Sequence, residues 1–225
     1  MNLSRNLLVS ATLASLLLSG CTSKVTMQNQ YSGFLSNYNN LGEVTTTSGE
    51  KAMRWVSPSW NQNAYDTMVF NKLELYPAPK PNEQVNQQTL DELQTYMTSK
   101  AKGVLGQKYR VVSDTSAAPA GTKPLILRAA ITGVSASNEG MKWYEVVPIA
   151  AVVGATQAAT GHRDQDTNLF IEAEFIDAST NQTVAKVVRK VFGSQLSNDS
   201  QKITTQDFKA AIDKLNADLW AFIRN

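Results

Sequence analysis

Residues 168–192, NLFIEAEFIDASTNQTVAKVVRKVF, decide the fold. Their alternation of apolar and polar side chains predicts two strands, 168–177 and 183–192. Ser179-Thr180-Asn181 between them is a typical turn sequence, so the pair is expected to form a β-hairpin. The apolar positions of this hairpin are Leu169, Ile171, Ala173 and Phe175 in the first strand, and Val184, Val188 and Phe192 in the second.

In the first strand of the hairpin the charged side chains alternate with these apolar positions. Glu172 and Glu174 would lie across from Lys186 and Lys190. Opposite charges on paired strands stabilise a sheet, so we interpret these residues as charge pairing on an exposed face and not as a catalytic carboxylate pair. Small basic groups are interpreted as solvated surface: Lys100 with Lys102, and Lys186 with Arg189 and Lys190.

Further strands are predicted by the same alternation at 67–76, 108–113 and 125–135. A helix is expected from a capping box at Thr89 and Glu92 to a stop at Gly106. Its apolar positions recur at helical spacing: Leu90, Leu93, Met97, Ala101 and Val104. A final helix, capped by Thr204 or Thr205, carries a second stripe: Phe208, Ile212, Leu215, Leu219 and Phe222.

This order of elements predicts an α+β fold. We expect a largely antiparallel sheet of four to five strands with two helices on one face, plus an apolar insert between strands. No internal repeat is present, and the length suits one domain, residues 31–225.

The first twenty residues have the pattern of a cleavable secretion signal. Arg5 is their only charge, and the apolar stretch from Leu7 to Leu18 is shorter than the roughly 20 residues that span a bilayer. Leu18-Ser19-Gly20-Cys21 resembles a bacterial lipobox. We therefore predict cleavage between Gly20 and Cys21, lipidation of Cys21, and a lipid-anchored tether over residues 21–30.

The resemblance extends to the residue after the cysteine. Thr22 stands where aspartate would imply retention in the inner membrane, so the sorting pattern of Gram-negative lipoproteins implies the outer membrane, facing the periplasm. Two or three acyl chains anchor a protein stably, so the expected partner is a membrane, held through covalent lipid on Cys21.

Composition excludes several classes of protein. Removing Arg5 leaves 20 basic against 19 acidic residues in the mature chain, and no clustered basic face indicates nucleic-acid binding. The single cysteine is consumed by lipid, so no intrachain disulfide is expected.

Catalytic and metal-binding patterns are also missing from the sequence. His162 is the only histidine, and no nucleophile elbow or phosphate-binding loop occurs. Asp164, Asp166 and Asn168 begin like a calcium loop, but Leu169 stands where its glycine belongs. We interpret 161–168 as a solvated connection and predict no catalytic residue, no metal and no cofactor.

A family resemblance rests on short motifs along most of the mature chain. Ser32-Gly33-Phe34-Leu35 after the lipobox, followed by Tyr38 and Leu41, resembles a proteobacterial lipoprotein family, domain of unknown function 3313. Trp55-Val56, the Tyr65–Tyr76 stretch, the glycine-containing apolar insert and the hairpin near Asp177 fit the same pattern. The resemblance implies no established activity.

The insert itself, WYEVVPIAAVVGATQAATG over residues 143–161, is uncharged from Val146 onward. Buried core is the favoured interpretation, while a subunit contact and a lipid contact stay open, because exposed apolar surface marks interaction sites. The candidate interaction surface consists of Trp143, Tyr144, Val146, Val147, Ile149, Val152 and Val153. The partner would be a second copy of the chain or another envelope protein.

Trp55 and Trp60 flank Pro58 and could stack on sugar rings, although pinning the N-terminal region to the domain is favoured. The working hypothesis is an accessory or structural component of an envelope assembly, not an enzyme. The alternatives are a lipid- or glycan-binding envelope module and a hydrolase whose carboxylates are distant in sequence.

Overall fold

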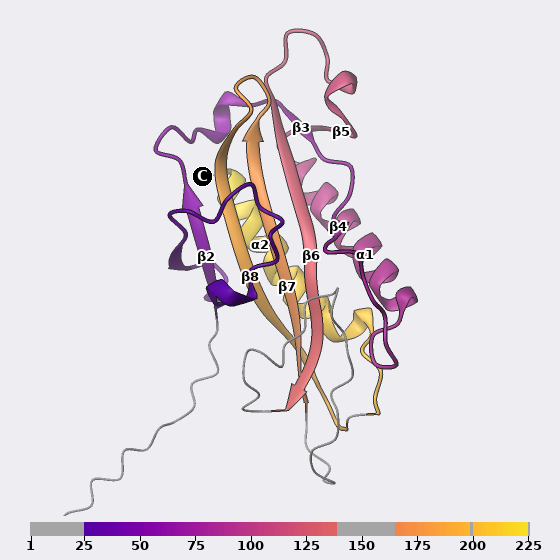
Figure 1. The fold of residues 1–225 in the computed structure, drawn as a ribbon. Coiled ribbons are helices and arrows are strands. Elements are labelled where there is room, and N and C mark those ends of the chain that lie inside the picture. Colours follow the sequence, from indigo (N-terminus) through magenta and orange to yellow (C-terminus); the bar gives the residue numbers. More distant parts are fainter. Residues whose placement is uncertain (1–24, 139–164, 199, 225) are drawn as a thin grey trace, which may run out of the picture.

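The computed structural model describes residues 25–138, 165–198 and 200–224. They form a mixed sheet with two α-helices and several short 3₁₀ turns (Figure 1). The helices are α1 (Gln87–Leu105) and α2 (Lys209–Arg224). The strands are β1 (Gly42–Thr45), β2 (Lys51–Val56), β3 (Thr67–Val69), β4 (Glu74–Leu75), β5 (Arg110–Val112), β6 (Pro124–Asn138), β7 (Gln165–Asp177) and β8 (Gln182–Leu196).

Three long antiparallel strands, β6, β7 and β8, make the centre of the sheet. The order across it is β1-β2-β8-β7-β6-β3-β5, and β4 also pairs with β6. β3 and β4 run parallel to β6, and β3 runs parallel to β5. The α+β class and the mostly antiparallel character of the sheet are confirmed.

The strand count expected from sequence is wrong, because the described sheet has eight strands and not four to five. The stretch 67–76 is not one strand: residues 70–73 separate β3 from β4. The β1–β2 hairpin was not predicted, since GEVT and KAMRWV lack a clear alternation. The expected packing of the sheet is also incomplete. The helices cover only one face of the sheet, and residues 31–41 cover the other face.

The hairpin turn and the helix termini show which local sequence signals determine where the strands and helices begin and end. Asn181 adopts a left-handed φ of 54°, and the Asp177 carboxylate accepts from the Ser179 amide at 2.8 Å. Helix α1 begins one turn before the predicted capping box, because Asn86 Oδ1 accepts from the Thr89 amide at 2.8 Å. The end of α1 at Gly106 is confirmed. Thr204 begins the second helical region with a capping box to Asp207 and a 3₁₀ turn before α2.

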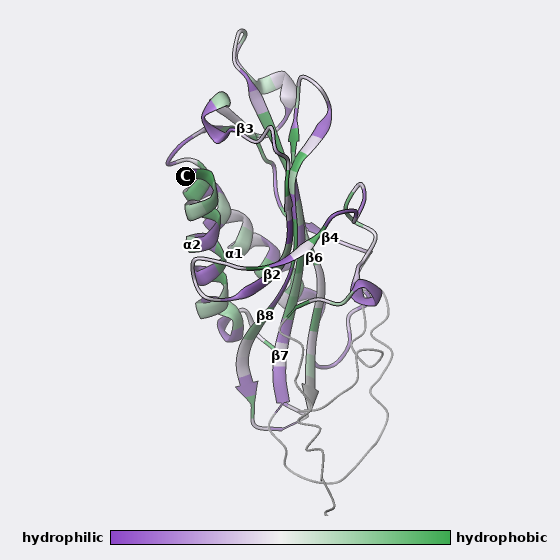
Figure 2. Cartoon of the chain, turned by 90° about the vertical axis from the view of Figure 1, so that its left-hand side faces the viewer, coloured by the Kyte–Doolittle hydropathy of each residue, from purple (hydrophilic) through white to green (hydrophobic). Residues whose placement is uncertain are grey.

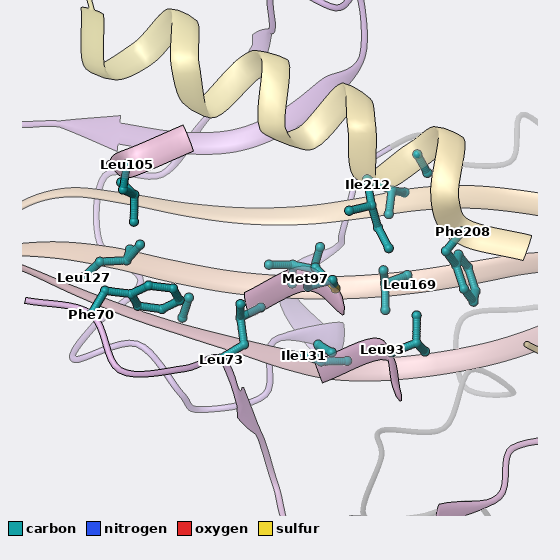
Figure 3. Close-up of a cluster of buried hydrophobic side chains, with 14 of the residues drawn as sticks. Phe70, Leu73, Leu93, Met97, Leu105, Leu127, Ile131, Leu169, Phe208 and Ile212 are labelled. Atoms are coloured by element: carbon teal, nitrogen blue, oxygen red, sulfur yellow. The ribbon is translucent and has the colours of Figure 1, made fainter. Parts of the chain in front are cut away.

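The main core lies between the sheet and both helices, which Figure 2 shows on the same side of the sheet. The side chains labelled in Figure 3 come from the loop after β3, from β6 and β7, from α1, and from α2 with the 3₁₀ turn before it. The predicted inward positions Leu169, Ile171 and Phe175 belong to this core. Fully buried members include Phe70, Leu93, Leu125, Ile131, Leu169, Phe208 and Ile212.

A smaller cluster covers the opposite face of the sheet. Phe34 and Leu35 pack there against Ala130 and Val188. Figure 1 shows the indigo segment that contains them crossing in front of the long strands, with α2 behind. Among the described helices, none has the length and apolar character needed to cross a bilayer.

Gly193 in β8 gives a direct test of this packing. A Cβ at this position would lie 2.4 Å from Thr167 Oγ1 and 2.6 Å from the Asp207 carbonyl oxygen. We expect Gly193→Ala to lower the free energy of unfolding by about 1–3 kcal/mol, the usual effect of overpacking. Gly103→Ala in α1 is the control, because nothing lies within 4 Å of its Cβ. That control should raise the free energy of unfolding by about 0.5–1 kcal/mol, and equal effects of both changes in urea unfolding would contradict the packing described.

Candidate functional site

Two buried glutamates anchor the N-terminal segment, residues 31–41, to the sheet. Glu172 and Glu174 on β7 are both 0% exposed. Glu172 Oε1 accepts from the Ser32 amide at 2.8 Å, and its Oε2 accepts from the Tyr38 hydroxyl at 2.5 Å. Both oxygens of Glu172 are thus used to hold the segment.

Glu174 binds the same segment and the neighbouring strands. Arg128 Nη1 on β6 donates to Glu174 Oε1 at 2.7 Å. Glu174 Oε2 accepts from Ser36 Oγ at 2.7 Å and from Thr183 Oγ1 at 3.2 Å. The Arg128 guanidinium also lies 4.9 Å from the ring centroid of Phe34, so one cation contacts both the carboxylate and the apolar cover.

Lys186 is a buried cation on the same face, whereas the Arg128 side chain is 40% exposed. Its Nζ donates to the Asn37 carbonyl oxygen at 3.2 Å and to the Asn37 side chain, and it lies 5.2 Å from the Trp55 ring centroid. Burial lowers the pKa of Lys186, and the charge of Glu174 opposes that shift. The prediction that this sheet face is exposed is therefore wrong, because residues 31–41 cover the glutamates. Charge pairing across the strands is confirmed, since Glu174 pairs with Arg128 and lies opposite Lys186.

The family motif supplies the geometry of this contact. Gly33 has a φ of 89°, which favours glycine, and its amide donates to the Tyr38 hydroxyl at 2.8 Å. Tyr31 stacks on Tyr38 with ring centroids 4.6 Å apart. Burial, together with the hydrogen bond to Glu172, raises the pKa of Tyr38 to about 12. The motif residues thus hold one segment of the chain against two carboxylates. They are Ser32, Gly33, Phe34, Leu35 and Tyr38.

A buried ion pair lies on the helix face of the sheet. Arg189 Nη1 on β8 donates to Asp218 Oδ2 on α2 at 2.7 Å, and their side chains are 5% and 8% exposed. Asp218 also accepts from Thr47 Oγ1 and from the amide and hydroxyl of Ser48, each at 2.8 Å. The prediction that Lys186 and Arg189 are solvated surface is wrong for both residues, whereas Lys100 is exposed and pairs with Asp213.

Beside this ion pair, an apolar cavity of about 160 Å³ lies between the sheet and the helices. Alanines from four strands and α1 line it: Ala52, Ala101, Ala129, Ala173 and Ala185. A second hollow, of about 460 Å³, shares four of its lining residues with the cavity: Thr46, Arg54, Asp218 and Phe222. The cavity and the hollow therefore meet between the β1–β2 hairpin and α2.

Several candidates from the sequence lie outside the described residues. These are the cleavage and lipidation positions Gly20 and Cys21, His162 and Asp164, and the proposed interaction surface, Trp143, Tyr144, Val146, Val147, Ile149, Val152 and Val153. The interpretation of 161–168 as a solvated connection is wrong for its end, because Gln165, Thr167 and Asn168 are buried in β7.

Trp60 takes part in packing. Its ring stacks on Phe222 with centroids 5.1 Å apart and on Tyr65 at 6.1 Å. It joins the region after β2 to α2 and so agrees with the structural interpretation of the Trp55–Trp60 patch. Within the described residues, no three histidine, cysteine or acidic side chains are grouped as a metal site.

Comparison with known proteins finds relatives that are bacterial lipoproteins. Uncharacterized lipoprotein YdcL of Escherichia coli strain K12 is 45% identical over 214 residues, which cover 95% of this chain and 94% of the relative. The lipoprotein of the same name in Escherichia coli O157:H7 matches equally. The class of protein is thus a bacterial lipoprotein.

The family model described as "Protein of unknown function (DUF3313)" matches residues 30–219, and the chain belongs to this family. Two solved structures are more distantly similar, each at 11% identity, a TM-score of 0.38 and coverage of 73% of this chain. One is a neuraminyllactose-binding hemagglutinin homolog from Helicobacter pylori, covered to 83%. The other is the PelC dodecamer from Paraburkholderia phytofirmans, covered to 94%.

Removing the Tyr38 hydroxyl tests the glutamate-bound segment. Tyr38→Phe leaves Glu172 Oε2 without its donor, and we expect the free energy of unfolding to fall by about 1–3 kcal/mol. Amide exchange at Ser32 and Ser36 should become faster in the native state. Tyr31→Phe is the control, because the stack is kept and the Tyr31 hydroxyl makes no hydrogen bond among the described residues. If both variants exchange at the wild-type rate, Glu172 does not hold the segment.

The Arg189–Asp218 pair predicts a pH dependence of stability. Burial raises the pKa of Asp218, but hydrogen bonds from Arg189, Ser48 and Thr47 outweigh it and lower the pKa from 3.8 to about 2. A depressed carboxyl pKa stabilises the fold above the unfolded value, and that stability is lost as pH falls from about 4 toward 2. The stability difference between wild type and Asp218→Asn should therefore shrink across this range in urea unfolding, whereas a constant difference would contradict the assignment.

Proposed function

We propose that the protein is a non-catalytic interaction module, anchored by lipid on Cys21 to the inner leaflet of the outer membrane and facing the periplasm. It would serve as an accessory or structural component of an envelope assembly. The observation that carries this proposal is the fixation of residues 32–38 on the sheet by Glu172 and Glu174.

That fixation limits how far the domain extends from its anchor. Ser32 follows Cys21 by eleven positions. A fully extended chain spans at most roughly 3.3–3.6 Å per residue, so Ser32 lies within about 40 Å of the lipid. The domain would therefore contact partners in or next to the outer membrane and could not bridge the periplasm alone.

The proposal that the module is non-catalytic rests on the hydrogen bonds and burial of the two glutamates on the sheet. Glu172 and Glu174 are close in sequence and share one face, as a carboxylate pair for hydrolysis would. Their oxygens are engaged by the N-terminal segment and Arg128, and neither side chain is exposed. This pair has no face open to a substrate.

The ends of the apolar insert support an interaction role. Asn138, the last residue of β6, pairs with Gln165, the first of β7, so the insert leaves and re-enters the sheet at one point. Figure 1 shows this point at the end of the long strands where both helices begin, and Gln84, just before α1, donates to Gln165 at 3.0 Å. An insert at the tip of a rigid sheet is well placed to contact a partner.

Two experiments test the proposal in cells. Cys21→Ala should abolish acylation and remove the protein from the outer-membrane fraction; a variant that is still acylated and membrane-bound would contradict the anchor. Photoreactive residues placed singly through 146–158 should capture a discrete envelope protein or a second copy of the chain. Exposed Ala210 on α2 is the control position for the photoreactive residue. Capture of lipid alone, or equal capture at Ala210, would contradict the assembly role.

A further inference from the structure

We propose that the cavity between α1, α2 and the sheet binds a single-chain anionic amphiphile, with the alkyl chain among the alanines and the anionic head beside Arg54 and Arg189. This site is independent of the assembly role proposed above. It lies wholly within the described residues and on the opposite face of the sheet from the N-terminal segment.

The lining of the cavity suits an alkyl chain. Its volume of about 160 Å³ is large enough for several apolar carbon atoms, since a dry cavity of roughly 150 Å³ binds benzene in another protein. Figure 3 shows Phe70, Leu73, Met97, Leu127 and Ile212, which also line the cavity, projecting from the sheet side and from both helices toward one space. The alanines on the strands leave this space unfilled.

The polar end of the cavity has unused hydrogen-bond donors. Arg189 lines the cavity, its side chain is 5% exposed, and its Nε and Nη2 have no hydrogen-bond partner among the described residues. Buried guanidinium donors are normally satisfied, because leaving them unpaired costs free energy. A carboxylate or phosphate oxygen would satisfy them and match the planar guanidinium.

The net charge at this end also favours an anion. Arg54 and Arg189 contribute two positive charges, and Asp218 contributes one negative charge. Asp218 already accepts four hydrogen bonds, from Arg189, Thr47 and Ser48, so it is not available to bind a cationic head. Arg54 lines both the cavity and the hollow and lies 5.7 Å from the Phe222 ring centroid, where a ligand would enter.

The test uses the full lipidated protein in phosphatidylcholine nanodiscs. The probe is dodecanoic acid with a photoreactive diazirine on its chain, and labelled residues are mapped by mass spectrometry. We expect labels on cavity residues such as Met97 and Leu219. Dodecanoate or dodecyl phosphate should compete, and their relative potency distinguishes a carboxylate from a phosphate ligand. Dodecanol and dodecyltrimethylammonium, which share the chain but lack the negative charge, should not compete.

Matched variants separate chain binding from head binding. Ala101→Leu fills the cavity and should abolish labelling, while Ala210→Leu makes the same change on the exposed side of α2 and should not. Arg54→Gln breaks no ion pair in the described structure. It should raise the dodecanoate concentration needed for competition by roughly ten- to a hundredfold, the value of a hydrogen bond to a charged group.

Each result decides for or against the site. The site is supported if cavity residues are labelled, if the anionic competitors reduce that labelling, and if Ala101→Leu abolishes it. Labels confined to residues outside the cavity, competition by dodecanol equal to that by dodecanoate, or wild-type labelling of Ala101→Leu would overturn it. If Ala101→Leu does not fold, as judged by circular dichroism, the label map and Arg54→Gln decide, since neither depends on that variant.

Discussion

Burial of two carboxylates on the second face of the sheet is the constraint on which the structure depends. Removing an ionised carboxylate from water costs several kcal/mol unless its oxygens are bonded. Glu172 and Glu174 meet this condition with donors from Ser32, Ser36 and Tyr38 in the N-terminal segment, together with Arg128 and Thr183 on the neighbouring strands. The N-terminal segment must therefore adopt one conformation, which sets an upper limit on the distance between Cys21 and the sheet.

On the helix face of the sheet a buried charge is also paired, but by different residues. Period-two alternation in β8 places Lys186 toward the N-terminal segment and Arg189 toward α2. Asp218 then joins α2 to β8 and, through Thr47 and Ser48, to the β1–β2 turn. One strand thus contacts the N-terminal segment through Lys186, the last helix through Arg189 and the edge hairpin through backbone pairing with β2.

Sequence patterns predicted the elements whose signals are local. The hairpin at Asp177, the inward face of β7, helix α1 up to Gly106 and the start of the second helical region all follow from periodicity, turn residues and caps. β1 and β2 were missed because an edge hairpin with few apolar residues takes its stability from pairing with β8. The stretch 67–76 was joined wrongly, since both of its short strands pair with β6 and alternation does not reveal a break between them.

The wrong predictions about the charged side chains of the hairpin have one physical origin. Alternation shows which side chains share a face, but it does not show what covers that face. The cover for Glu172 comes from Ser32, 140 positions earlier, and the cover for Arg189 comes from Asp218 on the last helix. The sequence contained one signal for the cover of the glutamates and another for the cavity on the helix face. Hydroxyl-bearing residues recur around Ser32-Gly33-Phe34-Leu35, and Ala129 and Ala173 lie directly opposite each other on the core face. Small residues at paired core positions leave space under bulky helices, so alanines in a predicted core strand can indicate a binding cavity.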